Sequence, residues 1–166
     1  IRLIFDVLSK GNEKEMIGDD CAIIEYGINY LLVSTDMISE STHLPRFITP
    51  WQTGWFVVAI NLSDIAAKGG KPLGLVISLG LPREKSITFL EELIKGADNC
   101  ASSYNTSIIG GDTKENSNLT ICGTVFGLVK KDEFMSRIGS RYGDIIAVTG
   151  YLGKAAAGYY SSKSNI

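Results

Sequence analysis

The sequence has very few of the residues that build zinc sites and disulfide frameworks. Among its 166 residues, His43 is the only histidine, and there are three cysteines, Cys21, Cys100 and Cys122. An odd number of cysteines at wide spacing forms neither a CxxC metal pair nor a disulfide framework. We therefore expect the cysteines to be reduced, as in an intracellular, cytoplasmic protein.

Long apolar runs and a large net charge are also lacking. No apolar run approaches the roughly 18 residues that a transmembrane helix needs. Sixteen basic and eighteen acidic residues give a net charge of -2, which argues against a general nucleic-acid or membrane-surface binder. Neither a GxxxxGK[ST] phosphate loop nor a GxGxxG dinucleotide fingerprint occurs, so we exclude both of these nucleotide-binding motifs.

What the chain does have is enough apolar sequence for a buried core, with 45% apolar and 20% charged residues. Strands alternate with helices, which favours a mixed sheet of four or more strands with two main helices packed on it, in the α+β class. The predicted strands are Cys21–Tyr26, Tyr30–Thr35, Leu73–Leu81, Ser107–Ile109, Leu119–Val129 and Asp144–Thr149.

The two main helices have clear start signals. The first runs from Pro50 to about Lys68, with Thr49 as its N-cap and Gln52 completing a capping box. The second begins near Ser86, and its apolar residues recur on one helical face. A shorter helix is predicted at Lys154–Tyr160, after a polar stretch at residues 136–143.

The polar stretch divides the chain into residues 1–140, an N-terminal domain, and residues 141–166, the beginning of a second α/β domain. The chain opens at Ile1 without a methionine and closes soon after a helix start. We therefore expect it to be a piece of a longer polypeptide, which lacks a little at the front and much at the back.

Aspartates recur where a predicted element ends and a loop begins, namely Asp20, Asp36, Asp64 and Asp112. Carboxylates brought together repel one another, and their pKa values rise unless a cation neutralises them. Carboxylate and hydroxyl ligands suit Mg²⁺ before Zn²⁺, and Mg²⁺ usually binds together with substrate phosphates. If these residues converge, the pattern predicts nucleotide phosphate chemistry; the alternative is that each aspartate is an ordinary cap or turn residue.

Asp64 is the hardest of these to explain as a turn residue. It lies near the C-terminal end of a helix that is apolar nearly all round, where the helix dipole disfavours a negative charge. A bound cation would compensate for this position. The alternative partner is Lys68, one helical turn further on.

Several segments, in this order, resemble the thiamine-monophosphate kinase family. They are Ile17–Ala22, Ser34–Met37 followed by His43, Asn61–Gly69, Ile109–Thr113, Ser136–Gly139 and Val148–Gly150. The similarity therefore covers almost the whole chain. The NxxD type of helix alone recurs across a wider superfamily, which includes aminoimidazole ribonucleotide synthetase, selenophosphate synthetase and a hydrogenase maturation enzyme.

The resemblance implies ATP-dependent phosphorylation of thiamine phosphate to thiamine diphosphate, by direct in-line transfer with several Mg²⁺ ions. Asp36, Asp64 and Asp112 would serve catalysis through the metal. It also implies a homodimer in which strands of two subunits form a barrel. By the same likeness the metal ligands are Asp20, Ser34, Thr35, Asp36, Asp64 and Asp112, the nucleotide contacts are Gly111, Asp112 and Arg137, and the contact to thiamine phosphate is His43.

Two departures from the family pattern stand out: Lys68, where relatives often have Met, and Leu44, where they often have Phe. We expect neither to touch the proposed ligands.

Two alternatives stay open, namely another ATP-using enzyme of the superfamily, of the selenophosphate synthetase or hydrogenase maturation type, and a non-catalytic dimerisation or nucleotide-binding domain. The selenophosphate synthetase type would be expected to have a reactive cysteine or selenocysteine, and Cys21 follows two acids that raise its pKa. We expect this chain alone to be inactive.

Overall fold

The computed structural model describes residue 4 and residues 18–164 of the chain. Ile17, the first residue of one family-like segment, lies outside the described residues. A five-stranded sheet forms the centre of the fold, in the order β1-β2-β5-β3-β4. Its strands are β1 (Ala22–Tyr26), β2 (Asn29–Ser39), β3 (Lys71–Leu81), β4 (Ile108–Glu115) and β5 (Thr120–Lys130). β3 and β4 are parallel, whereas β1–β2, β2–β5 and β3–β5 are antiparallel. The predicted mixed sheet is thus confirmed.

The first main helix, α3 (Pro50–Ala67), begins as its sequence predicts. The Gln52 amide donates to the Thr49 hydroxyl at 3.2 Å, and the Thr49 amide donates to the Gln52 side-chain oxygen at 2.9 Å, which completes the capping box. The helix ends before Gly69, whose φ of 71° suits a glycine at a helix C-terminus. This capping fixes the two ends of the element that carries Asp64.

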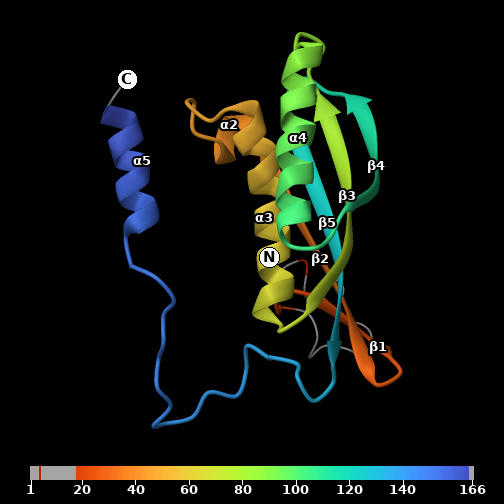
Figure 1. The fold of residues 1–166 in the computed structure, drawn as a ribbon, viewed down its shortest axis with the longest axis vertical. Helices are drawn as coiled ribbons and strands as arrows, with labels where there is room; N and C mark the ends of the chain where they lie inside the picture. Colours follow the sequence, from red (N-terminus) through yellow and green to blue (C-terminus); the bar gives the residue numbers. More distant parts are fainter. Residues whose placement is uncertain (1–3, 5–17, 165–166) are drawn as a thin grey trace.

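The second main helix, α4 (Ile87–Ser103), packs directly against α3 (Figure 1). Glycines make this contact close. A Cβ atom on Gly54 would lie 1.8 Å from the Leu93 carbonyl oxygen, and one on Gly96 would lie 1.9 Å from that of Trp51. The two helix backbones therefore touch, and both helices lie on the same face of the sheet.

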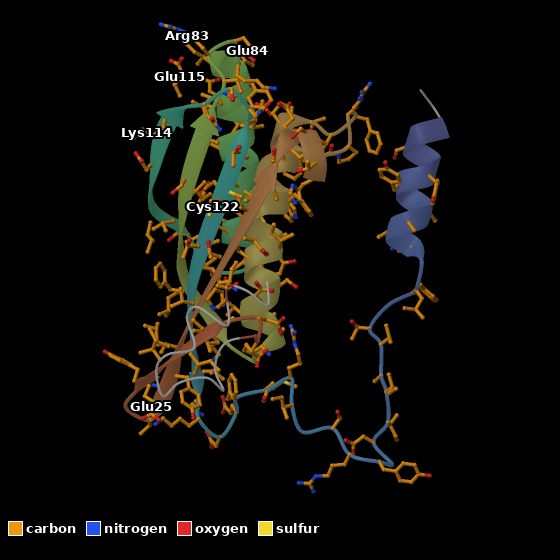
Figure 2. All side chains as sticks on the ribbon, turned by 180° about the vertical axis from the view of Figure 1, so that it is seen from behind. Glu25, Arg83, Glu84, Lys114, Glu115 and Cys122 are labelled. Carbon is orange, nitrogen blue, oxygen red and sulfur yellow. The ribbon has the colours of Figure 1, made fainter. Side chains whose placement is uncertain are left out.

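The buried core lies between these helices and the sheet. Its wholly buried residues include Leu32, Val57, Val58, Ile65, Leu75, Leu93, Ile121 and Val125. The opposite face of the sheet, seen from behind in Figure 2, carries Cys122. By strand register and alternation this uncovered face also holds Ile24, Leu31, Val33, Met37, Phe126 and Leu128. In the described part of the chain, no helix is long and apolar enough to cross a membrane.

One strand prediction is wrong. No strand forms at Asp144–Thr149, where Ile145 and Ile146 are each 93% exposed. A strand needs a neighbouring strand to pair with, and among the described elements none lies alongside this segment. A short helix, α2 (Glu40–His43), follows β2, and the helix predicted at Lys154–Tyr160 forms as α5 (Lys154–Ser164).

Candidate functional site

Asp64, on α3, and Asp36, on β2, lie close enough for the Asp36 charge to act on Asp64. The Ser34 hydroxyl donates to an Asp64 carboxylate oxygen at 2.5 Å, and Ser34 and Asp36 share one face of β2 because side chains alternate along a strand. Burial raises the pKa of Asp64, the Ser34 hydrogen bond partly offsets this, and the negative charge of Asp36 raises the pKa further. The raised pKa predicted for carboxylates that come together is therefore found at Asp64.

A buried amide holds the Asp36 backbone in place. Asn61 is wholly buried, its NH₂ group donates to the Val57 carbonyl at 2.8 Å, and its oxygen accepts from the Asp36 amide at 3.1 Å. A Cβ atom on Gly123, which pairs with Asp36 on the neighbouring strand β5, would lie 2.4 Å from the Asn61 side-chain nitrogen. The sequence interpretation missed this positioning role. The available signal was an amide one turn before Asp64 in an otherwise apolar helix.

Lys68 does not form an ion pair with Asp64, the pairing that the sequence left open as an alternative to a bound cation. Its ammonium pairs instead with Asp19 and with Asp20, at 3.1 Å to an Asp20 oxygen. Burial disfavours the charged form, but the hydrogen bonds to Asp19 and Asp20 outweigh it and raise the pKa of Lys68. The expectation that Lys68 does not touch the proposed ligands is therefore wrong, because Asp20 is one of them.

Arg137, in the segment that follows β5, reaches the same two carboxylates. Its guanidinium hydrogen-bonds to an Asp20 oxygen and donates to the Gly18 carbonyl at 3.3 Å. Burial opposes ionisation of Asp19, but hydrogen bonds from Lys68 and from the Asp20 and Arg137 amides outweigh it and lower the pKa of Asp19. The structure thus brings Arg137 and Asp20, more than a hundred residues apart, into one cluster.

Asp112 lies on the other face of the sheet. Asp36 and Asp112 both sit inside strands rather than at strand ends, so that part of the prediction is wrong. In the strand register, Asp112 on β4 lies opposite Ser78 on β3, and Ser78 lies opposite Cys122 on β5. These three side chains line one shallow hollow. Its carboxylate is 3.5 Å from the Lys114 ammonium. Within this chain the sheet therefore separates Asp112 from Asp36.

Thr35 shares the face of Asp112. Its hydroxyl donates to the Gly123 carbonyl at 2.9 Å and lies 3.0 Å from the Thr124 hydroxyl. Gly111, next to Asp112, is packed so closely on β3 that an added Cβ would lie 2.0 Å from the Ile77 carbonyl oxygen. The proposed ligands thus form two groups, one on each face.

His43 ends α2 with one ring nitrogen already engaged. The Ser39 amide donates to Nδ1 at 3.2 Å, and the Thr42 hydroxyl lies 2.7 Å from the same atom. Because Nδ1 accepts a hydrogen bond, a neutral ring carries its proton on Nε2. A hollow of about 810 Å³ adjoins this helix, lined by Glu40, Ser41, Leu44, Pro45, Arg46, Phe47 and Tyr159.

Cys21 is buried beside the acidic residues. Its thiol donates to the Asp64 carbonyl at 3.4 Å. Burial, with a further contribution from the Asp64 charge, raises the pKa of Cys21 to about 12. The thiol is therefore a poor nucleophile at neutral pH, as the sequence predicts, although burial outweighs the neighbouring acids as the cause.

The donors at Asp36 and Asp64 fit a hard cation. Among the described residues, no group of three or more His, Cys, Asp or Glu side chains could by itself hold a metal ion. Two carboxylates and the Ser34 hydroxyl are nevertheless the oxygen ligands that Mg²⁺ takes, and Mg²⁺ commonly completes its shell with waters and substrate phosphates. Burial and, to a smaller extent, the Asp36 charge raise the pKa of Asp64, and a cation bound beside Asp64 would lower it.

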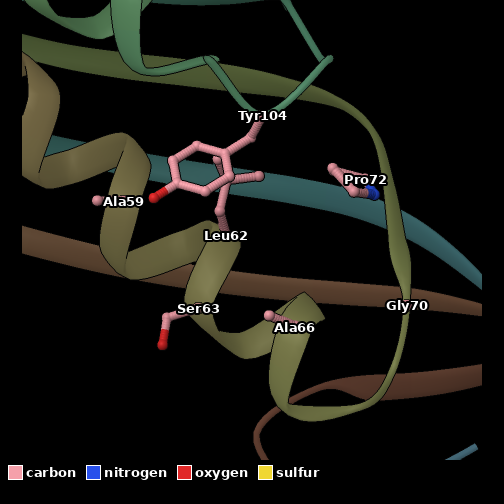
Figure 3. A pocket seen from close by; sticks show the side chains of 7 residues that line it. All are labelled: Ala59, Leu62, Ser63, Ala66, Gly70, Pro72 and Tyr104. Carbon is pink, nitrogen blue, oxygen red and sulfur yellow. The ribbon is translucent and has the colours of Figure 1, made fainter. Parts of the chain in front are cut away.

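A separate apolar cavity of about 410 Å³ lies beside α3 (Figure 3). Tyr104 extends over it from the end of α4, and Pro72 closes one side. Leu62, Ser63 and Ala66 of the family-like segment Asn61–Gly69 line this cavity, but none of the candidate metal ligands or substrate contacts does. We therefore do not assign it to the acidic site.

The fold and the acidic pair define the class of the protein. The chain belongs to the family described as AIR synthase related protein, N-terminal domain, whose model matches residues 18–129. More particularly, it is similar to the thiamine-monophosphate kinase of Methanospirillum hungatei, with 43% identity over 140 residues, covering 84% of this chain and 48% of the relative. The thiamine-monophosphate kinase of Aquifex aeolicus is 34% identical over 155 residues, covering 93% and 50%.

A solved structure has the same fold. The structure of AaThiL complexed with AMPPCP and TMP superposes with a TM-score of 0.90 at 31% identity, covering 99% of this chain and 52% of that one. The chain thus spans about half the length of the curated relatives that it matches.

Proposed function

We propose that this chain supplies the nucleotide- and metal-binding part of an ATP-dependent thiamine-monophosphate kinase. The observation that carries the proposal is the Asp36–Asp64 pair, in which burial and mutual repulsion raise the pKa of Asp64. The likeness to a protein complexed with an ATP analogue and TMP supports the same activity. Residues 1–140 form the binding domain, residues 141–166 begin a second one, and the protein is cytoplasmic.

Asp36, Asp64 and Asp112 act through Mg²⁺, with Ser34 and Thr35 adding hydroxyl ligands. The resemblance adds Asp20 to these ligands. In this structure its carboxylate forms ion pairs with Lys68 and Arg137. The bound Mg²⁺ ions would neutralise phosphate charge. The attacking oxygen of thiamine phosphate is already ionised at neutral pH, so transfer is direct and needs no strong general base. A stable phosphoenzyme trapped with labelled ATP would contradict this mechanism.

Three further residues bind the substrates. The Gly111 backbone and the Arg137 guanidinium contact the nucleotide, since Arg matches phosphate geometry well. His43 contacts thiamine phosphate through Nε2–H, the ring atom left free to donate when Nδ1 accepts from Ser39. The adjoining hollow contains Arg46 and Phe47, a cation for the phosphate and a ring for the heterocycle.

A homodimer would complete the site. Thr35 and Asp112 lie on the uncovered, partly apolar face of the sheet. Joining two such faces would bury apolar side chains and bring these ligands close to the partner subunit. Another ATP-using enzyme of the same superfamily is the second candidate; the buried, high-pKa thiol of Cys21 disfavours the selenophosphate synthetase type.

The first test is a calorimetric titration of the chain with AMPPCP, with and without Mg²⁺. We expect weak binding that requires Mg²⁺ and is lost in Asp36→Ala. The matched control is Asp98→Ala, which removes an exposed carboxylate on α4 and should bind as the unchanged chain does. Failure of the folded, dimeric chain to bind AMPPCP would contradict a nucleotide site here. The acceptor is then tested by assaying the whole protein for thiamine diphosphate.

A further inference from the structure

The acidic site already contains a buried positive charge. Lys68 follows α3 as its C-cap residue, and its side chain is only 2% exposed. Lysine is almost never fully buried unless it is paired. The partners here are the Asp19 and Asp20 carboxylates. A cationic group therefore occupies the end of the site where the family likeness places the metal ligand Asp20.

The site consequently has two unequal halves. The Asp19–Asp20 half is neutralised by Lys68 and Arg137. In the other half, Asp64 accepts a hydrogen bond from the Ser34 hydroxyl, and the Asp36 charge raises the pKa of Asp64 more than the Lys68 charge lowers it. A dication has far more to neutralise at Asp36 and Asp64 than at Asp20.

Binding of a divalent cation by Asp20 would also displace the Lys68 ammonium. The displaced ammonium would stay buried with Asp19 as its one remaining partner of the two, which is unfavourable. If both cations stayed, they would repel one another at close range.

We propose that Lys68 takes the place of one divalent cation, so that Asp20 serves as its ion-pair partner and divalent cations bind at Asp36 and Asp64. This inference rests on the proposed function for the presence of metal at the site. It makes Lys68 a residue that sets how many metal ions the chain takes.

The test counts Mn²⁺ ions bound per chain by equilibrium dialysis, with Mn²⁺ as the probe for Mg²⁺. Lys68→Met should bind about one more Mn²⁺ than the unchanged chain, because Asp20 becomes free to coordinate. Lys68→Arg keeps the charge and should leave the count unchanged. Lys71→Met removes an exposed charge three residues away and should also leave it unchanged. An unchanged count in folded Lys68→Met overturns the inference.

A second variant covers a failure of Lys68→Met to fold. Asp19→Asn combined with Lys68→Met removes one carboxylate together with the cation, and a gain in bound Mn²⁺ supports the inference while no gain overturns it. AMPPCP titration of the same samples separates the two proposals. Loss of nucleotide binding throughout contradicts the proposed function, whereas the Mn²⁺ count alone decides the role of Lys68.

Discussion

At the scale of single residues, Asp64 links the site to stability. The folded state holds the Asp64 proton more tightly than the unfolded chain does, because the pKa of Asp64 is raised on folding. Its contribution to stability is therefore largest at acid pH and is lost as pH rises through the folded pKa. Without divalent cations, ionised Asp64 weakens the fold at neutral pH.

We therefore expect Asp64→Asn to raise the midpoint of thermal unfolding by a few degrees at pH 7, since about 1 kcal/mol moves it by roughly 2–4 °C in a domain of this size. The gain should shrink toward pH 4. Adding Mg²⁺ should stabilise the unchanged chain more than the variant. Asp98→Asn is the control, and a lower midpoint for Asp64→Asn at pH 7 would contradict the argument.

How far the sequence predicts this site differs from residue to residue. The sequence singled out Asp64 because a carboxylate in an apolar helix needs a cation or a hydrogen-bond donor, and the structure supplies the Ser34 hydroxyl as that donor. The partners of Lys68 could not be predicted, since helical spacing points to Asp64 while the actual carboxylates, Asp19 and Asp20, come from a segment nearly fifty residues away. Spacing along one helix carries no information about which distant segment packs against it.

At the scale of elements, the two helices form where caps and periodicity predict, but their close approach depends on two glycines. Gly54→Ala should destabilise the protein by about 1–3 kcal/mol or more, because the added methyl group meets the Leu93 backbone rather than a movable side chain. Urea unfolding measures this. Gly158→Ala, in α5 with nothing within 4 Å of the new Cβ, should not destabilise. Equal stability of both variants would contradict backbone contact between α3 and α4.

The failed strand prediction belongs to the same scale. Asp144–Thr149 has the apolar, β-branched composition of a strand, yet its isoleucines are exposed. Composition indicates how well a segment would pack in a sheet. The segment forms a strand only where a neighbouring strand is available for backbone hydrogen bonding. By contrast, Thr120–Lys130 lies between two strands and forms over nearly the predicted length.

At the scale of the whole molecule, the uncovered face of the sheet decides whether the site works in one subunit or two. Met37 is 62% exposed on this face, in line with Cys122 and close to Thr35. In a two-fold dimer Met37→Lys would place two charges in the interface. If the proposed dimer forms through this face, we expect light scattering to show that the Met37→Lys variant is a monomer. AMPPCP binding should also weaken, because Thr35 and Asp112 would no longer lie beside a second subunit. Ile87→Lys, at an apolar position on α4 that is 78% exposed, is the control and should stay dimeric. A monomeric unchanged chain, or a dimeric Met37→Lys variant, would show that this face does not join two subunits.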